Sequence, residues 1–175
     1  MIWESSDWKE PLLKTANYLR RVRFSDNTSE KTLVRIEKEV LIGFYSVRKL
    51  LDTFKVSDST KALKFKVTYF KNIKKITYHN WHHIDELYDL SKADYEVRKI
   101  RNICDLFIHS YIYMPSGDFK ITGFYVTSDL TKDKKCYFIS IDILLSIFRT
   151  VGRDYPSCFE QKFNQKTNEI VSKVW

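Results

Sequence analysis

The sequence predicts a mainly α-helical α+β protein, an up-and-down bundle of four main helices with inserted β-hairpin elements. Apolar residues recur at helical spacing in four segments, and strand-like runs occur between those segments. The chain also has only 4 Gly and 3 Pro, which favours long regular elements. Its 175 residues are enough to bury a core, so we expect one domain over residues 1–175.

The first two helices are expected at residues 5–24 and 27–55. Asn27 and Glu30 give the second helix a capping signal, and its apolar residues recur over about seven turns. A helix of this length is expected to be a main element of the bundle. The apolar stripe expected on the first helix is Leu12, Ala16 and Leu19.

The β-containing insertions are expected at about residues 60–90 and 118–140. The first insertion has strand-like runs at 63–70 and 74–79, which are rich in β-branched and aromatic residues, and a short helix at 81–90. In the second insertion a polar turn separates two strand-like runs. That pattern predicts a β-hairpin.

The third and fourth helices are expected at residues 92–113 and 140–152. Ser91 and Ser140 are suitable N-caps for them. The tail after Pro156 receives no assignment. The apolar stripe expected on the third helix is Val97, Ile100, Cys104, Phe107 and Tyr111.

Charge and cysteine content restrict the class of protein. The net charge of +8 permits contact with nucleic acid or another polyanion, and it equally serves solubility. The three cysteines are far apart and form no CxxC pair, so we expect reduced thiols in a cytoplasmic protein. The N-terminal segment is acidic where a signal peptide is basic, and no apolar run is long enough for a membrane span.

The candidate catalytic residues are Arg101, Asn102 and His109, within the third predicted helix. An arginine offers a fixed positive charge to a phosphate, and a histidine exchanges protons near neutral pH. Together they suffice for RNA cleavage without a metal, and Asn102 could orient either group. Asp105 lies one turn after Arg101, where it is expected to pair with Arg101 and modulate its charge.

The run "RNICDLFIH" resembles the motif of the HEPN superfamily, an α-helical group that includes many metal-independent RNases of defence and toxin–antitoxin systems. Arg101, Asn102 and His109 match its Arg, polar residue and His, and Tyr111 matches a His-x-Tyr ending found in some HEPN toxins. The resemblance implies an endoribonuclease that needs no cofactor. It also implies a homodimer whose active site forms between the two copies, and a cognate antitoxin or defence-system partner.

The segment 61–78 is a second candidate site, for RNA binding. Lysines alternate there with Phe and Tyr, which supplies charge for phosphates and ring faces for bases. A solvated edge strand carries lysines too, to prevent aggregation. The expected RNA-binding residues are Lys64, Lys66, Lys71, Lys74 and Lys75.

Metal binding and several common enzyme classes are not expected. His79, His82 and His83 lie close in sequence, but no second His or Cys pair lies at a suitable spacing. The sequence also lacks the P-loop, dinucleotide-binding, nucleophile-elbow and HExxH motifs. The alternative to a ribonuclease is a non-catalytic helical module that binds a partner protein or RNA.

Overall fold

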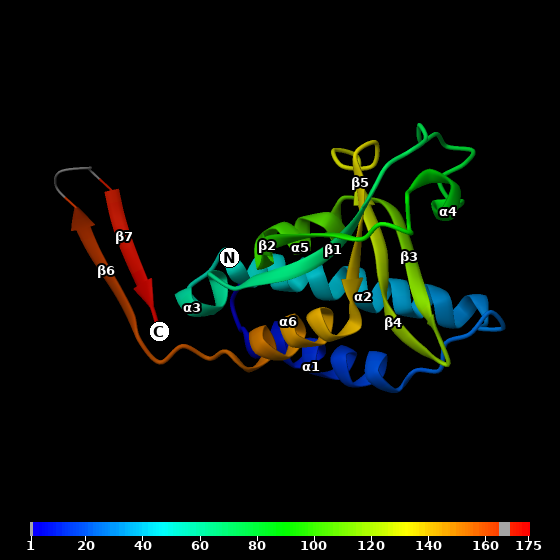
Figure 1. The fold of residues 1–175 in the computed structure, drawn as a ribbon. Helices are drawn as coiled ribbons and strands as arrows, with labels where there is room; N and C mark the ends of the chain where they lie inside the picture. The colour runs from blue at the N-terminus through cyan, green and yellow to red at the C-terminus, as the bar shows by residue number, and fades with distance from the viewer. Residues whose placement is uncertain (1, 165–168) are drawn as a thin grey trace.

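A five-stranded antiparallel sheet, covered on one face by helices, forms the centre of the protein (Figure 1). The structure is a computed structural model, and it describes residues 2–164 and 169–175. The helices are α1 (Ser6–Arg21), α2 (Glu30–Leu51), α3 (Asp58–Lys61), α4 (Ile84–Leu87), α5 (Ile100–Ile108) and α6 (Ile141–Arg153). The strands are β1 (Lys64–Lys71), β2 (Asp94–Lys99), β3 (Ser110–Asp118), β4 (Lys120–Ser128), β5 (Lys135–Ser140), β6 (Phe159–Asn164) and β7 (Glu169–Val174).

The strands of the sheet lie in the order β2-β1-β5-β4-β3, so β2 and β3 are its two edges. Both edge strands adjoin α5 in the chain, because α5 begins directly after β2 and ends one residue before β3. Strands β6 and β7 form a separate two-stranded sheet.

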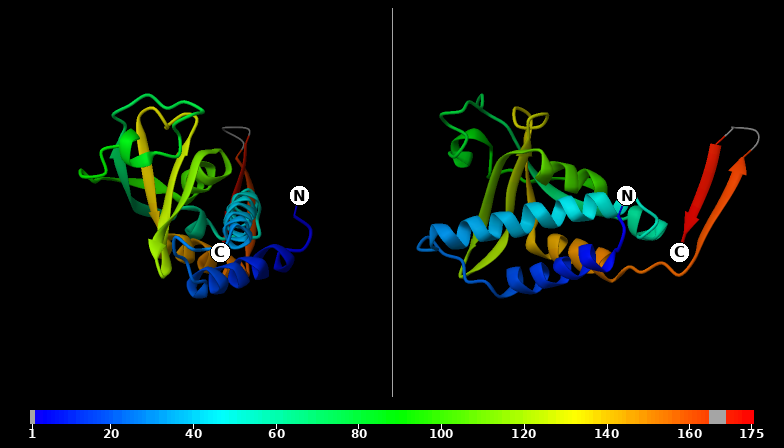
Figure 2. Two further views of the ribbon diagram at one scale, coloured as in Figure 1. Left: turned by 90° about the vertical axis from the view of Figure 1, so that its right-hand side faces the viewer. Right: turned by 180° about the vertical axis from the view of Figure 1, so that it is seen from behind.

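The two faces of the main sheet have different environments, as Figure 2 shows. We call the face toward α2, α5 and α6 the inner face, and the opposite face the outer face. On the inner face Val67, Val126 and Ile139 join the main hydrophobic core. On the outer face Phe70 and Cys136 join a smaller cluster beneath the segment that contains α4.

Aromatic side chains connect the helices to the sheet in the main core. The ring of Phe44 on α2 stacks on Phe107 of α5, with 4.0 Å between centroids, and meets the edge of Phe148 on α6. Phe107 in turn contacts Phe124 of β4. Burial of these rings holds three helices against the inner face.

The predicted four-helix up-and-down bundle is wrong, because strands form at both ends of the third predicted helix. Only residues 100–108 of the range 92–113 are helical. Residues 94–99 alternate between half-buried and exposed side chains and pair with β1, and residues 110–118 pair with β4. The protein is an α+β fold with two N-terminal helices and a five-stranded antiparallel sheet.

Several other predictions are confirmed. The two N-terminal helices, the short helix within 81–90, the strand at 63–70 and the helix that starts after Ser140 all form. The predicted hairpin forms as β4 and β5. The run at 74–79 was predicted as a strand, which is wrong, because it forms no strand.

Candidate functional site

The structure separates Arg101 from Asn102 and His109, the other two candidate catalytic residues. Arg101 and Asn102 lie in the first turn of α5, and His109 follows its last residue. The Arg101 side chain turns toward α2, where its Nη2 lies 2.5 Å from Oδ1 of Asp52. Asn102 and His109 are exposed and line a different surface. Within one chain, therefore, Arg101 does not face His109.

Two ion pairs join α2 to α5, and one of them involves Arg101. Asp52 also accepts a hydrogen bond from Arg48, whose Nε lies 3.0 Å from Oδ1 of Asp105. Partial burial raises the pKa of Asp52, but the two guanidinium groups outweigh it, and the pKa is lower than usual. The expected pairing of Arg101 with Asp105 is replaced by Arg101 with Asp52 and Arg48 with Asp105.

A groove beside α5 contains two of the three motif residues. It has a volume of about 450 Å³ and lies between α5 and residues 128–131. Asn102, Asp105 and His109 line it from α5, and Arg98 lines it from β2. We call this hollow the α5 groove.

Arg98, at the margin of the α5 groove, forms an ion pair with Glu96. Glu96 accepts hydrogen bonds from Arg98 Nε at 2.6 Å, from the hydroxyl of Tyr137 at 2.9 Å and from Lys135. Partial burial opposes ionisation, but these hydrogen bonds outweigh it and lower the pKa of Glu96 to about 2. The Glu96 network therefore connects β2 to β5 across the inner face of β1.

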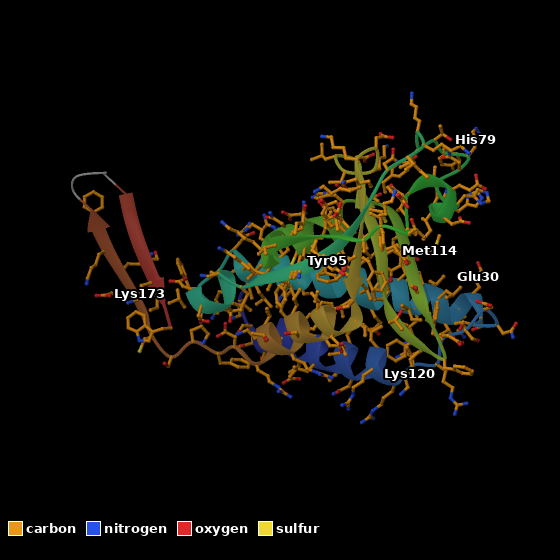
Figure 3. The ribbon with its side chains drawn as sticks, in the orientation of Figure 1. Glu30, His79, Tyr95, Met114, Lys120 and Lys173 are labelled. Atoms are coloured by element: carbon orange, nitrogen blue, oxygen red, sulfur yellow. The ribbon has the colours of Figure 1, made fainter. Side chains whose placement is uncertain are left out.

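A row of side chains crosses the outer face of the sheet from one edge to the other. The strand registers place its members directly opposite one another, and Figure 3 labels the two end residues. Neighbouring strands lie about 4.8 Å apart, so the row is roughly 19 Å long. Its members are Tyr95 on β2, Thr68 on β1, Phe138 on β5, Tyr125 on β4 and Met114 on β3.

Three exposed lysines lie beside the Tyr95 end of this row: Lys64 and Lys66 on β1 and Lys99 on β2. Lys66 Nζ lies 4.5 Å from the centroid of the Tyr95 ring. Lys64 and Lys99 are directly opposite each other, and like charges in that arrangement repel. In the described part of the chain, none of the three takes part in an ion pair.

We call the row and these three lysines the outer patch. Tyr95 is 58% exposed, so a flat ligand can reach its ring. The rings of Tyr125 and Phe138 contact each other at 5.0 Å and are only half buried. Gly123 permits this arrangement, because a Cβ there would lie 2.5 Å from the Phe138 ring. The outer patch thus combines ring faces with unpaired positive charge.

The remaining predicted lysines lie outside the outer patch. Lys71 is paired with Asp94 at 3.1 Å, and Lys74 with Glu86 at 3.2 Å. Lys75 is exposed in the loop after β1. The structure therefore brings together Lys64 and Lys66 of the predicted set and adds Lys99.

Tyr95 and Lys99 were missed as site residues because residues 92–113 were predicted to be a helix. Their alternation with Asp94, Glu96 and Arg98 is a two-residue period, which is the signal of a strand. Val97, predicted to be in the core, is 66% exposed.

The remaining candidate residues are His79, His82, His83 and Tyr111. The rings of His82 and His83 lie 4.0 Å apart, but the described residues contain no group of ligands that could hold a metal. Tyr111 lies on β3 and packs against the smaller hydrophobic cluster that contains Phe70 and Cys136. Lys132 Nζ lies 3.7 Å from the centroid of the Tyr111 ring.

Comparison of the chain with protein-family models, curated proteins and solved structures finds no match. Among the helices of the described residues, none is long and apolar enough to cross a membrane.

Proposed function

We propose that the protein binds single-stranded RNA on the outer patch. The observation that carries this proposal is a row that contains three aromatic rings, on Tyr95, Phe138 and Tyr125, with three lysines that form no ion pair at one end. Bases stack on exposed rings, and lysines attract the phosphates between them. The repulsion between Lys64 and Lys99 is relieved when a phosphate lies between them. An RNA ligand also agrees with the cytoplasmic location that the reduced cysteines favour.

The outer patch suits single strands better than a duplex. The faces of the bases are accessible for stacking only in an unpaired strand, whereas duplex RNA is recognised by its shape and its 2′-hydroxyl groups. A half-buried row of Tyr125 and Phe138 with an exposed Tyr95 presents rings, not a groove-shaped surface. We therefore expect little preference for sequence.

Fluorescence anisotropy with a labelled single-stranded RNA tests this proposal. Tyr95→Ala is expected to weaken binding by about 1–3 kcal/mol, because one stacked base is lost. Tyr45→Ala is the matched control, since Tyr45 is a tyrosine of similar exposure on α2, which covers the inner face. Equal affinity of Tyr95→Ala and the wild type would overturn the proposal.

The salt dependence gives a second measurement of the same interaction. Three lysines on phosphates predict that log K falls with log salt with a slope of about −2, at about 0.7 for each contact on a single strand. Lys66→Ala is expected to reduce the slope by about 0.7. A slope that Lys66→Ala leaves unchanged would show that the RNA lies elsewhere.

As a second function, we propose that the protein is a metal-independent ribonuclease of a defence or toxin–antitoxin system. The observation that favours it is that Asn102 and His109 line the same groove. Arg98 lies in that groove, while Arg101 is held by Asp52. The test is RNA cleavage in the presence of EDTA, with His109→Ala as the variant. The ribonuclease proposal predicts loss of cleavage in His109→Ala, and cleavage that persists would refute it.

A further inference from the structure

The hairpin of β6 and β7 stands away from the rest of the protein (Figures 1 and 2). It is attached at its base, where Phe159 packs on Phe54 with 4.1 Å between ring centroids. The backbone N–H of Val174 also donates to Asp58 at 3.0 Å. A two-stranded sheet alone is only marginally stable in water, and further strands stabilise it.

One edge of β6 is available for pairing. β7 occupies the other edge, and the available edge lies on the side away from the body in both figures. Among the described residues no further strand pairs with β6. The unpaired N–H and C=O groups of such an edge are a template for another strand.

The order of side chains along β6 is complementary to itself. The strand reads Phe159, Glu160, Gln161, Lys162, Phe163. When two copies pair antiparallel about Gln161, each Glu160 lies opposite Lys162 of the other copy, and each Phe159 opposite Phe163. We propose that the protein forms a homodimer by this pairing of β6 with β6, which joins the two hairpins into one four-stranded sheet.

A two-fold axis makes each contact occur twice. In an isologous interface residue i meets residue j and j meets i, so the dimer gains two Glu–Lys pairs and two Phe–Phe pairs. Phe159 is 47% exposed and Phe163 59% exposed, so both have area to bury. Within one chain Glu160 and Lys162 lie 2.8 Å apart, on the same side of the strand. In the dimer each also faces the opposite charge of the second copy.

The charges of Glu160 and Lys162 favour one register of the pairing, and they favour a second copy of β6 over an unrelated strand. Moving the centre of the pairing from Gln161 to Glu160 would place the two Glu160 residues opposite each other, and like charges there are unfavourable. An unrelated strand would not supply Lys opposite Glu and Phe opposite Phe at every position. The proposed interface lies far from α5 in Figure 1, whereas the motif resemblance implied that the candidate catalytic residues of the two copies meet at the interface.

Sedimentation equilibrium of the full chain, with charge-reversal variants, tests this dimer. Lys162→Glu places Glu opposite Glu twice, and Glu160→Lys places Lys opposite Lys twice. Each variant alone is expected to dimerise at least tenfold more weakly than the wild type. Mixed in equal amounts, the two variants regain opposite charges at both pairs and are expected to form a heterodimer of near wild-type affinity.

Controls separate the interface from folding. Lys120→Glu makes the same change in net charge as Lys162→Glu, but far from the hairpin, and is expected to dimerise like the wild type. Far-ultraviolet circular dichroism checks that every variant is folded. A wild type that stays monomeric would overturn the proposal. So would a Lys162→Glu protein that dimerises like the wild type, or a mixture of the two variants that stays monomeric.

Discussion

Replacing Glu96 by Gln is expected to destabilise the protein at neutral pH and to change little at low pH. Glu96 accepts hydrogen bonds from Arg98, Lys135 and Tyr137 on the inner face of the sheet. Gln has nearly the same shape but carries no charge. The variant therefore removes the ionic part of the Glu96 network and leaves the packing intact.

The magnitude follows from the pKa of the carboxyl group. Partial burial alone would raise this pKa, but the hydrogen bonds lower it from 4.5 to about 2. At about 1.4 kcal/mol per pH unit, the ionised carboxylate therefore stabilises the folded state by about 3 kcal/mol. Because Gln keeps some of the hydrogen bonds, the expected loss for Glu96→Gln at pH 7 is about 2 kcal/mol. A pKa that is lowered by folding gives stability above about pH 4.5 that is lost as the pH falls toward 2.

Urea denaturation of the wild type and Glu96→Gln at pH 7, 5 and 3 measures this effect. The difference in unfolding free energy is expected to narrow by about 2 kcal/mol between pH 7 and pH 3. Glu37→Gln serves as the control, since Glu37 is an exposed residue in the interior of α2, and we expect a change within about 0.5 kcal/mol. A difference between wild type and Glu96→Gln that is the same at pH 7 and pH 3 would refute the reasoning.

Two more variants and one thiol reagent test the packing and burial of particular side chains. In Gly43→Ala the new Cβ would lie 2.4 Å from Cζ of the buried Phe148, so we expect a loss of about 1–2 kcal/mol in thermal unfolding despite the better helix propensity of Ala. Lys9→Met removes hydrogen bonds of 2.6 Å to the backbone oxygens of Lys55 and Asp154, which predicts a loss of about 2 kcal/mol in urea denaturation. A thiol reagent is expected to label Cys158 alone in the folded protein, because the other two cysteines are buried, and all three in denaturant.

The long helix α2 could be predicted because its pattern is unambiguous. Ile36, Val40, Phe44 and Val47 recur at helical spacing, and all four are fully buried. Strand β1 was also predictable, because its β-branched and aromatic residues fit no helix well. In both cases local preference and tertiary packing agree.

The region 92–113 could not be predicted because its apolar residues satisfy two periods at once. Ile100, Cys104 and Phe107 are buried on α5, as a helix predicts, while Val97 and Tyr111 continue that spacing but lie on strands. No side-chain cap marks the start of α5 at Lys99. β2 is a strand because it pairs with β1, far earlier in the chain, and β3 is a strand because it pairs with β4, the next strand in a hairpin. Both partners lie outside the segment 92–113, so the segment alone does not report them.

The candidate RNA site was therefore only half predictable. Lys64 and Lys66 were identified from β1 itself. Tyr95 and Lys99 lie near them only because β2 pairs with β1 in one particular register. Likewise, the partner of Arg101 is Asp52, 49 positions away in the chain, and no short motif reports a contact of that kind.

Lys99 belongs to two structures at once: it is the last residue of β2 and the N-cap residue of α5. Its side chain lies in the outer patch, while its backbone sets the direction in which α5 crosses the inner face. The outer patch and the first turn of α5, where Arg101 and Asn102 lie, are therefore adjacent along the backbone although they lie on opposite faces of the sheet. A substitution at Lys99 that ends β2 early is therefore expected to change the start of α5 on the other face of the sheet as well.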